Sequence, residues 1–152
     1  MTAGAATDPK ATSTIEHAKQ EGKKSLILVV SKGGADMAYP SLILATTARA
    51  LGMDAHMYFT FWGMQLLTPQ GREKSMEVFP PEIRKAISSK FPTVEQFMQQ
   101  AKQAGVHIHA CSPTMDMFGL TKTSLVNEVD DIIGASTYLE LASRPDALTL
   151  FI

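Results

Sequence analysis

Cys111 is the only cysteine in a chain of 152 residues, and it ends an apolar stretch that leads into a proline turn, Val106-His107-Ile108-His109-Ala110-Cys111-Ser112-Pro113. A single thiol closes no disulfide within the chain and supplies no multi-cysteine zinc site. Two interpretations stay open at this point. The thiol is either a buried apolar residue, as many lone cysteines are, or a reactive sulfur at the end of a strand.

The reactive interpretation depends on the residues before Cys111 forming a strand. Side chains alternate between two faces along a strand, so His107, His109 and Cys111 would share one face. Open parallel sheets gather ligands beyond the carboxyl ends of their strands, and Cys111 stands at such an end. If Ser112 and Pro113 open a helix, its free N–H groups would stabilise an anionic sulfur and lower the pKa of the thiol. On this interpretation His109 lines the pocket and is available as a proton partner.

The same three residues, His107, His109 and Cys111, form a compact His-x-His-x-Cys set that could bind a metal. Zinc needs three or four converging ligands, and the local spacing fixes no fourth one. We therefore expect no metal at this site, and we expect His107 to be a hydrogen-bonded strand residue.

A glycine turn follows the first predicted strand, Ser31-Lys32-Gly33-Gly34-Ala35-Asp36. Nucleotide phosphates bind where a strand gives way to a helix, but this run matches neither the dinucleotide fingerprint G-x-G-x-x-G nor the P-loop pattern. We expect a tight turn capped by Asp36 and no bound cofactor. Gly33 and Gly34 would lie on the same sheet edge as Cys111 and form a wall of its pocket. Ligand binding at this turn remains the alternative.

An aromatic segment, Phe59-Thr60-Phe61-Trp62-Gly63, follows the second predicted strand and should reach the same edge. Trp62 and its neighbours would form a pocket wall or a subunit contact, since aromatic side chains are common in both. Packing in the core is equally compatible with the pattern. Neither a Ser/His/Asp spacing nor a carboxylate pair is recognisable elsewhere in the chain.

The elements that position these residues alternate between strands and helices. Strands are predicted at residues 25–30, 53–59, 106–110, 129–133 and 147–152. Helices are predicted from Asp36 or Tyr39 to Gly52, from a capping box at Thr93 to Gly105, over 121–128, and from a cap at Ser136 to Arg144, with a short turn from Ser112. The order predicts an α/β three-layer sandwich of the flavodoxin or Rossmann type, with about five mostly parallel strands.

Two further segments complete the predicted organisation. Residues 61–91 read as a long crossover with one or two short helices. Residues 1–22 predict a flexible tail, in which the capping-box spacing Ser13-Thr14-Ile15-Glu16 permits a short helix. Residues 23–152 are then expected to form a single domain.

Composition narrows the class of protein. The net charge is −1 and no basic run exceeds Lys23-Lys24, which disfavours binding to nucleic acid. The longest apolar region, 57–67, is too short for a membrane span of about 20 residues, and the first ten residues lack the pattern of a secretory signal. With a single cysteine, these features predict a cytoplasmic, reducing location. Nine methionines and a charged fraction of 19% favour a surface partly covered by another subunit.

Three segments resemble the DsrE/DsrF-like sulfur-relay family, most closely its DsrE-like branch, whose members are often described as peroxiredoxin-like. They are residues 30–36, 58–63 and, most specifically, 110–119, and the ending at 147–152 also fits. The similarity covers about residues 24–152. It implies a cytoplasmic sulfur carrier or sulfurtransferase whose cysteine, matched by Cys111, accepts a persulfide or thiosulfonate group. Ser112, Thr114 and Met115 lie in the cysteine segment and are expected to support the pocket.

The resemblance also implies partners. A TusA-like protein would accept the cargo, a rhodanese-like protein is a candidate donor, and the chain would form a homotrimer or hexamer with the cysteine near a subunit boundary. Some relatives carry a second, upstream cysteine, but this chain has Gln103 in that region, which excludes a hand-off within the chain. A non-catalytic ligand-binding module and an oligomeric scaffold remain alternatives. A thiol peroxidase is disfavoured because no second cysteine resolves a sulfenate.

Overall fold

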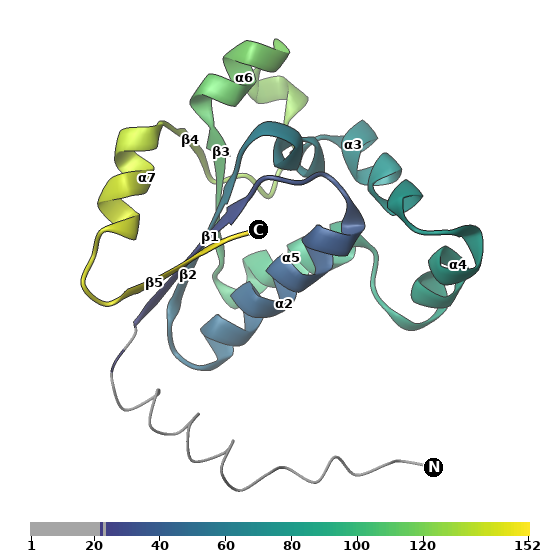
Figure 1. Ribbon diagram of the computed structural model, residues 1–152, viewed down its shortest axis with the longest axis horizontal. Coiled ribbons are helices and arrows are strands. Elements are labelled where there is room, and N and C mark those ends of the chain that lie inside the picture. Colours follow the sequence, from purple (N-terminus) through teal and green to yellow (C-terminus); the bar gives the residue numbers. More distant parts are fainter. Residues whose placement is uncertain (1–21, 23) are drawn as a thin grey trace, which may run out of the picture.

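The structure, a computed structural model, describes residues 22 and 24–152, which build one sheet flanked by helices (Figure 1). The tail predicted for residues 1–22, with its short helix, lies outside the described residues except for Gly22. That residues 23–152 form a single domain stays a prediction.

Five parallel strands build the sheet of the described residues, in the order β4-β3-β2-β1-β5. They are β1 (Ser25–Val30), β2 (Asp54–Phe59), β3 (His107–Cys111), β4 (Asp131–Ile133) and β5 (Ala147–Phe151). Every residue of β1 is buried, which agrees with its unbroken apolar sequence. The predicted α/β fold with a parallel sheet is confirmed.

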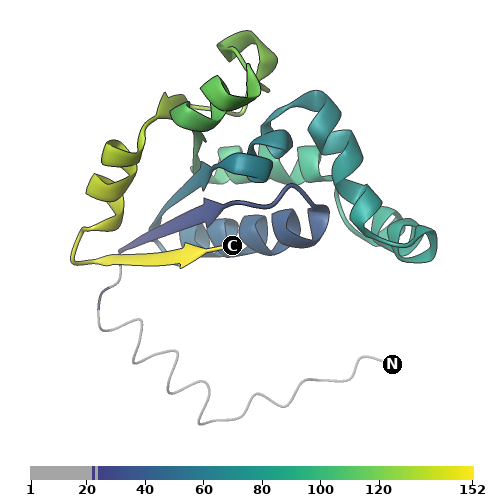
Figure 2. The ribbon, with the colours of Figure 1, turned by 45° about the horizontal axis from the view of Figure 1, so that its top comes forward.

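Helices lie on both sides of the sheet, so the fold has three layers (Figures 1 and 2). The α-helices are α2 (Ala35–Ala50), α3 (Pro69–Lys74), α4 (Pro81–Lys90), α5 (Val94–Ala104), α6 (Ser112–Phe118) and α7 (Ala135–Ala142). The 3₁₀ helices are η1 (Phe61–Leu67), η2 (Ser75–Val78) and η3 (Lys122–Ser124). α2 and α5 pack together over one face, and α7 lies on the opposite face. α6 and η1 follow the ends of β3 and β2, at the sheet edge that carries Cys111.

The core lies mainly between the sheet and the pair α2 and α5. Leu28, Met57 and Ile108 occupy neighbouring register positions on three adjacent strands, and all three are fully buried. Leu42 of α2 and Met98 of α5 are buried as well. Burial of a side chain of this size contributes roughly 1.5–3 kcal/mol, so this layer holds the strands that carry the site.

Helix α5 begins and ends where the sequence predicts. The Thr93 side chain accepts a hydrogen bond from the Gln96 N–H at 3.1 Å, and the Gln96 side chain accepts one from the Thr93 N–H at 2.9 Å. These two bonds form a complete capping box. The helix stops at Gly105, whose φ of 94° is left-handed and favours glycine.

Two predicted helix caps are wrong. Asp36 lies inside the first turn of α2, whose N-cap is Gly34, and Ser136 lies inside α7, whose N-cap is Gly134. Both helices therefore begin earlier than their polar residues suggest. The Asp36 carboxylate still favours α2, because it lies near the positive end of the helix dipole.

The helix predicted over residues 121–128 is also wrong, since only the short η3 forms there. The Val126 N–H donates to the Leu67 carbonyl at 2.8 Å, which ties this segment to η1 instead of to its own preceding turn. β4 begins later than predicted, at Asp131, because Asp130 bonds to β3 through its side chain. The Ile108 N–H donates to the Asp130 carboxylate at 2.7 Å, and the Asp130 N–H donates to the Ile108 carbonyl at 2.8 Å.

The crossover predicted over residues 61–91 holds two α-helices, α3 and α4, together with η1 and η2. Thr68 caps α3 by accepting from the Gly71 N–H at 3.1 Å. Among the helices of the described residues, none combines the length and the apolar composition that a membrane span requires.

Candidate functional site

Cys111 stands at a junction between two elements. It is the last residue of β3 and the N-cap of α6, so the predicted strand end and helix start are both confirmed. Only 5% of the residue is exposed. Because a lone buried cysteine usually packs among apolar groups, the groups around the thiol decide between the two interpretations.

Three hydroxyl groups surround the thiol. The side chains of Thr114, Thr60 and Tyr58 hydrogen-bond to it, and so does the backbone of Thr114. Tyr58 lies on β2 and Thr60 comes two residues later, so both side chains point to one face of the sheet. The register pairs Tyr58 with His109, which places Cys111 on that face too. The immediate surroundings of the sulfur are therefore polar.

Thr114 is held by the segment that follows β2. The Phe61 N–H donates to Thr114 Oγ1 at 3.0 Å, and Thr60 Oγ1 lies 3.2 Å from the same atom. Phe61 has a φ of 46°, a left-handed backbone that costs a non-glycine residue roughly 1–3 kcal/mol. The local strain therefore lies at the residue whose N–H donates to Thr114.

The hydroxyl donors make the thiol more acidic. Burial alone raises the pKa of Cys111, because a low-dielectric site disfavours the charged sulfur. The bonds from Thr114, Thr60 and Tyr58 act in the opposite direction and outweigh burial, so the pKa lies below its ordinary value. Burial and the neighbouring sulfur raise the pKa of Tyr58, which keeps its hydroxyl protonated and able to donate. These donors therefore favour the nucleophilic thiolate over the neutral thiol.

Two glycines allow the loops at this edge to pack backbone against backbone. A Cβ atom on Gly63 would lie 2.0 Å from the Val30 carbonyl oxygen, and one on Gly33 would lie 2.7 Å from the Trp62 carbonyl oxygen. No side chain fits at either position. This packing fixes the path of the chain from Thr60 onward. The glycine turn after β1 therefore helps to hold Thr60 beside the thiol.

Three other predicted site residues belong to the turn after β1 and the start of α2. Gly33, Gly34 and Asp36 do not belong to the groups that hydrogen-bond to Cys111. A Cβ atom on Gly34 would lie 2.3 Å from the Asp36 carboxylate, so the packing of the turn itself accounts for the second glycine. Neither glycine therefore requires a bound nucleotide to explain it.

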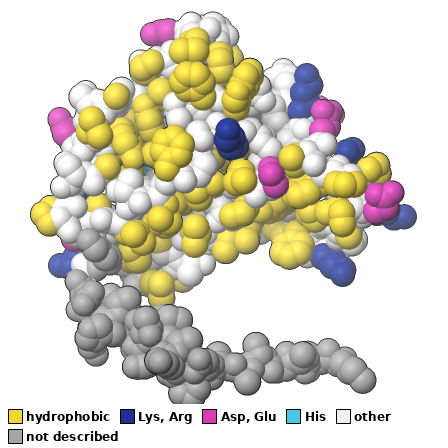
Figure 3. Space-filling view, viewed as in Figure 1, with side chains coloured by type: hydrophobic (Ala, Val, Ile, Leu, Met, Phe, Trp, Pro, Cys, Tyr) yellow, Lys and Arg dark blue, Asp and Glu magenta, His cyan; other side chains and the backbone are white. Residues whose placement is uncertain are grey.

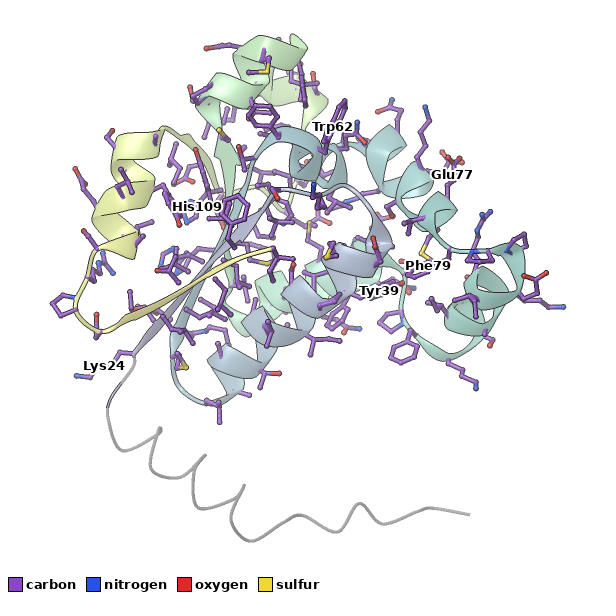
Figure 4. The ribbon with its side chains drawn as sticks, viewed as in Figure 1. Lys24, Tyr39, Trp62, Glu77, Phe79 and His109 are labelled. Carbon is purple, nitrogen blue, oxygen red and sulfur yellow. The ribbon has the colours of Figure 1, made fainter. Side chains whose placement is uncertain are left out.

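Trp62 lies on the surface beside α6. It is 56% exposed, and its ring lies 5.5 Å from that of Phe118 on α6. Figure 4 shows Trp62 on η1 below α6, and Figure 3 shows apolar side chains gathered on the surface at α6. Its ring thus joins η1 to α6, and the expected role of Trp62 as a pocket wall stays a prediction.

His109 shares the face of Cys111, but its ring contacts other groups. His109 Nδ1 lies 2.5 Å from Asp131 Oδ1, and His109 Nε2 lies 2.9 Å from His56 Nδ1. Both ring nitrogens are therefore engaged, which argues against the expected role as proton partner of the thiol. The residue is buried on the side of the sheet that faces α7 (Figure 4).

His107 and His56 complete a stack of imidazole rings. The His56 and His107 centroids are 4.6 Å apart and nearly parallel, and His107 is exposed. Burial, together with the neighbouring His107 and His109, lowers the pKa of His56 to about 4. The described residues contain no group of three His, Cys, Asp or Glu side chains arranged to hold a metal ion. His107 is a strand residue, as expected, since it begins β3 and pairs in register with His56, and its ring stacks on that of His56.

The remaining predicted residues lie on α6. Thr114 contacts the thiol directly, Met115 is buried, and Ser112 opens the helix without being among the donors to the sulfur. Sequence reasoning missed Tyr58 and Thr60. Their spacing of two on a strand beside β3 was a usable signal, because it puts two hydroxyls on one face at the same edge.

Comparison with known proteins identifies the class. The chain has a parallel five-stranded sheet, with a hydroxyl-bound cysteine at the carboxyl ends of the strands. Its sequence matches the model of the DsrE/DsrF/DrsH-like family over residues 22–82 and 72–151. The chain belongs to the DsrE/DsrF/DrsH-like family.

Individual relatives span nearly the whole chain. The sulfur carrier protein DsrE2 of Allochromatium vinosum is 29% identical over 153 residues, which cover 82% of this chain and 96% of the relative. The uncharacterized protein YrkE of Bacillus subtilis is 26% identical over 160 residues, which cover 87% of this chain and 99% of the relative. The crystal structure of the ychN protein from E. coli matches with a TM-score of 0.59 at 16% identity, covering 85% of this chain and 98% of that one. This last likeness supports the fold alone.

Proposed function

We propose that the protein is a sulfur carrier or sulfurtransferase that holds its cargo on Cys111. The observation that carries the proposal is the buried thiol whose pKa is lowered by three hydroxyls and a backbone donor. Such a site stabilises a sulfur anion, as thiolate or as persulfide, without a metal or cofactor. A relative named as a sulfur carrier supports the same function.

The proposed reaction transfers one sulfur atom without net oxidation. The Cys111 thiolate attacks the terminal sulfur of a donor persulfide, R–S–SH, and a bond forms between these two sulfurs. The bond between the two donor sulfurs breaks, and its electron pair leaves on R–S⁻. Cys111 then carries –S–SH, which a thiolate of an acceptor attacks in the same way, so that Cys111 returns as a thiolate.

A thiosulfonate cargo follows the same chemistry. With tetrathionate, the Cys111 thiolate attacks an inner sulfur, and thiosulfate leaves with the electron pair of the broken S–S bond. The product carries –S–SO₃⁻ on the cysteine sulfur. The same donors, Thr114, Thr60 and Tyr58, would bind either cargo next to Cys111.

The wider setting belongs to the proposal too. A TusA-like protein is the proposed acceptor and a rhodanese-like protein the candidate donor, in the cytoplasm, with the chain as a homotrimer or hexamer. As the sole cysteine, Cys111 has no second thiol in the chain to receive the sulfur, so donor and acceptor are separate molecules. Trp62, which is exposed and lies on η1 shortly after Thr60, is a candidate contact for such molecules.

Mass spectrometry of the intact protein tests the function. After incubation with inorganic polysulfide or with tetrathionate, Cys111 should gain one sulfur atom or the –S–SO₃⁻ group, and dithiothreitol should remove either. The Cys111→Ser variant is the matched control and should gain nothing. If the wild-type protein gains neither group while an established persulfide carrier does so in parallel, the proposed function is wrong.

A further inference from the structure

We propose that helix α7 is a movable cover over the Cys111 site, and that Tyr138 closes it by stacking on Tyr58. The proposal rests on the proposed function, because it concerns how sulfur cargo reaches the thiol. Tyr138 would control access to the thiol and would take no part in the sulfur transfer itself.

A direct line of contacts runs from the helix to the sulfur. The Tyr138 and Tyr58 rings are stacked with centroids 4.9 Å apart and an angle of 18° between their planes. The Tyr58 hydroxyl hydrogen-bonds to the Cys111 thiol. α7 lies across the face opposite α2 and α5, which is the face that carries Tyr58 and Cys111 (Figures 1 and 2). The stack therefore joins the outer layer to the reactive group.

The thiol is too enclosed to react as it stands. Cys111 is 5% exposed, and the acceptor sulfur of a partner must come within bonding distance of it. The cavity of about 470 Å³ beside Tyr39 and Phe91 is lined by other residues, so it gives no route to the sulfur. One of the elements around Cys111 must move for a protein-bound sulfur to reach it.

Among the elements around Cys111, α7 is the one without a buried residue. None of its residues is fully buried, and Leu139 is 60% exposed, whereas α2 buries six residues against the sheet. Its side-chain hydrogen bond to β5, from Thr149 Oγ1 to the Ala142 carbonyl, is 3.5 Å long. The segments on the other sides of the thiol are locked by the backbone packing at Gly33 and Gly63. Elements with few buried contacts open at the lowest free energy.

The chain entering α7 also has room to turn. Gly134 links β4 to the helix, and nothing lies within 4 Å of the position where a Cβ atom would be. β4 pairs Ile133 with Cys111, so the hinge starts directly beside the thiol. A rotation about Gly134 would lift Tyr138 away from Tyr58 and leave the hydroxyl donors in place.

The rate of Cys111 alkylation by iodoacetamide tests this in the full chain. The rate is measured on its high-pH plateau, where the sulfur is fully ionised, so that access alone limits it. Since an aromatic pair contributes about 0.5–1.5 kcal/mol beyond its buried area, Tyr138→Ala should raise the plateau rate roughly three- to tenfold. Tyr138→Phe keeps the ring and should match wild type, as should Leu139→Ala on the exposed side of the same helix.

Two outcomes overturn the proposal. One is a plateau rate in folded Tyr138→Ala equal to that of Leu139→Ala. The other, which needs no variant, is amide hydrogen exchange in residues 135–142 of the wild-type protein as slow as in α2. Alkylation requires no sulfur cargo, so a failure of the proposed sulfur transfer leaves these measurements valid. Equally, sulfur uptake with an unchanged plateau rate would retain the function and reject the cover.

Discussion

Thr114 Oγ1 lies 3.2 Å from Thr60 Oγ1, and this pair joins the first turn of α6 to the chain that leaves β2. Both hydroxyls also hydrogen-bond to Cys111. The segments that follow β2 and β3, which are neighbouring strands in the sheet, thus meet beside one sulfur. The Phe61 N–H bond to Thr114, across 53 residues of sequence, joins the same two segments.

Replacing Thr114 by Val should weaken both the thiolate and the fold. The substitution removes a donor to Cys111 and leaves the Phe61 N–H without its acceptor. The pKa of Cys111 should rise, and the alkylation rate at neutral pH should fall about tenfold. The unfolding free energy should drop by about 1–3 kcal/mol, measured by urea denaturation. Thr114→Ser keeps the hydroxyl and is the control; equal losses in both variants would contradict the role of the hydroxyl.

Tyr58→Phe should change the acidity of the thiol without changing access to it. The variant keeps the ring that stacks on Tyr138 and loses only the hydroxyl that donates to Cys111. The alkylation profile should shift to higher pH, with a rate at neutral pH about three- to tenfold lower and an unchanged plateau. A profile identical to that of wild type would show that the Tyr58 hydroxyl does not stabilise the thiolate.

Acidification should destabilise the fold through His56. Its pKa is about 4 in the folded protein against 6.5 for a free side chain, so the unfolded chain binds more protons between these values. Stability should therefore be complete above about pH 6.5 and decline as the pH falls toward 4. Because the ring is partly exposed, we expect a loss of roughly 1–2 kcal/mol. His56→Gln should flatten this part of the stability curve measured by urea denaturation at a series of pH values, and an unchanged slope would contradict the assignment.

Gly63→Ala should disrupt the loop that places Thr60 and Phe61. The added methyl group would meet the Val30 carbonyl oxygen at 2.0 Å, and backbone cannot yield as a flexible side chain does. We expect a loss of about 2–4 kcal/mol of unfolding free energy, with slower alkylation of Cys111 in any folded fraction. Gly134→Ala is the matched control, since its Cβ position is open and its φ of −91° suits any residue. That variant should stay within about 0.5 kcal/mol of wild type.

Local sequence signals predicted the elements that depend on local contacts. The apolar run of β1 and the capping box at Thr93 gave correct elements because burial and two short-range bonds decide them. The segment 121–128 failed because a bond between distant residues, from the Val126 N–H to the Leu67 carbonyl, overrides its helical pattern.

In the candidate site, too, local features could be predicted and contacts between distant residues could not. The position of Cys111 at a strand end could be predicted, since it needs only the boundary of one strand. The spacing of Tyr58 and Thr60 could place their hydroxyls on one face, but only the register between β2 and β3 brings them to the sulfur. The role expected of His109 was displaced by His56 and Asp131, which come from the strands on either side of it.

The donors around Cys111 are uncharged, and this sets how the site responds to its solution. A thiolate held by lysine, arginine or protonated histidine loses part of its stabilisation when dissolved ions screen the pair. Hydroxyl and amide dipoles act only at contact distance, where mobile ions do not enter. The pKa of Cys111 should therefore be nearly independent of ionic strength. Added salt would change how fast a partner protein binds but not how nucleophilic the sulfur is.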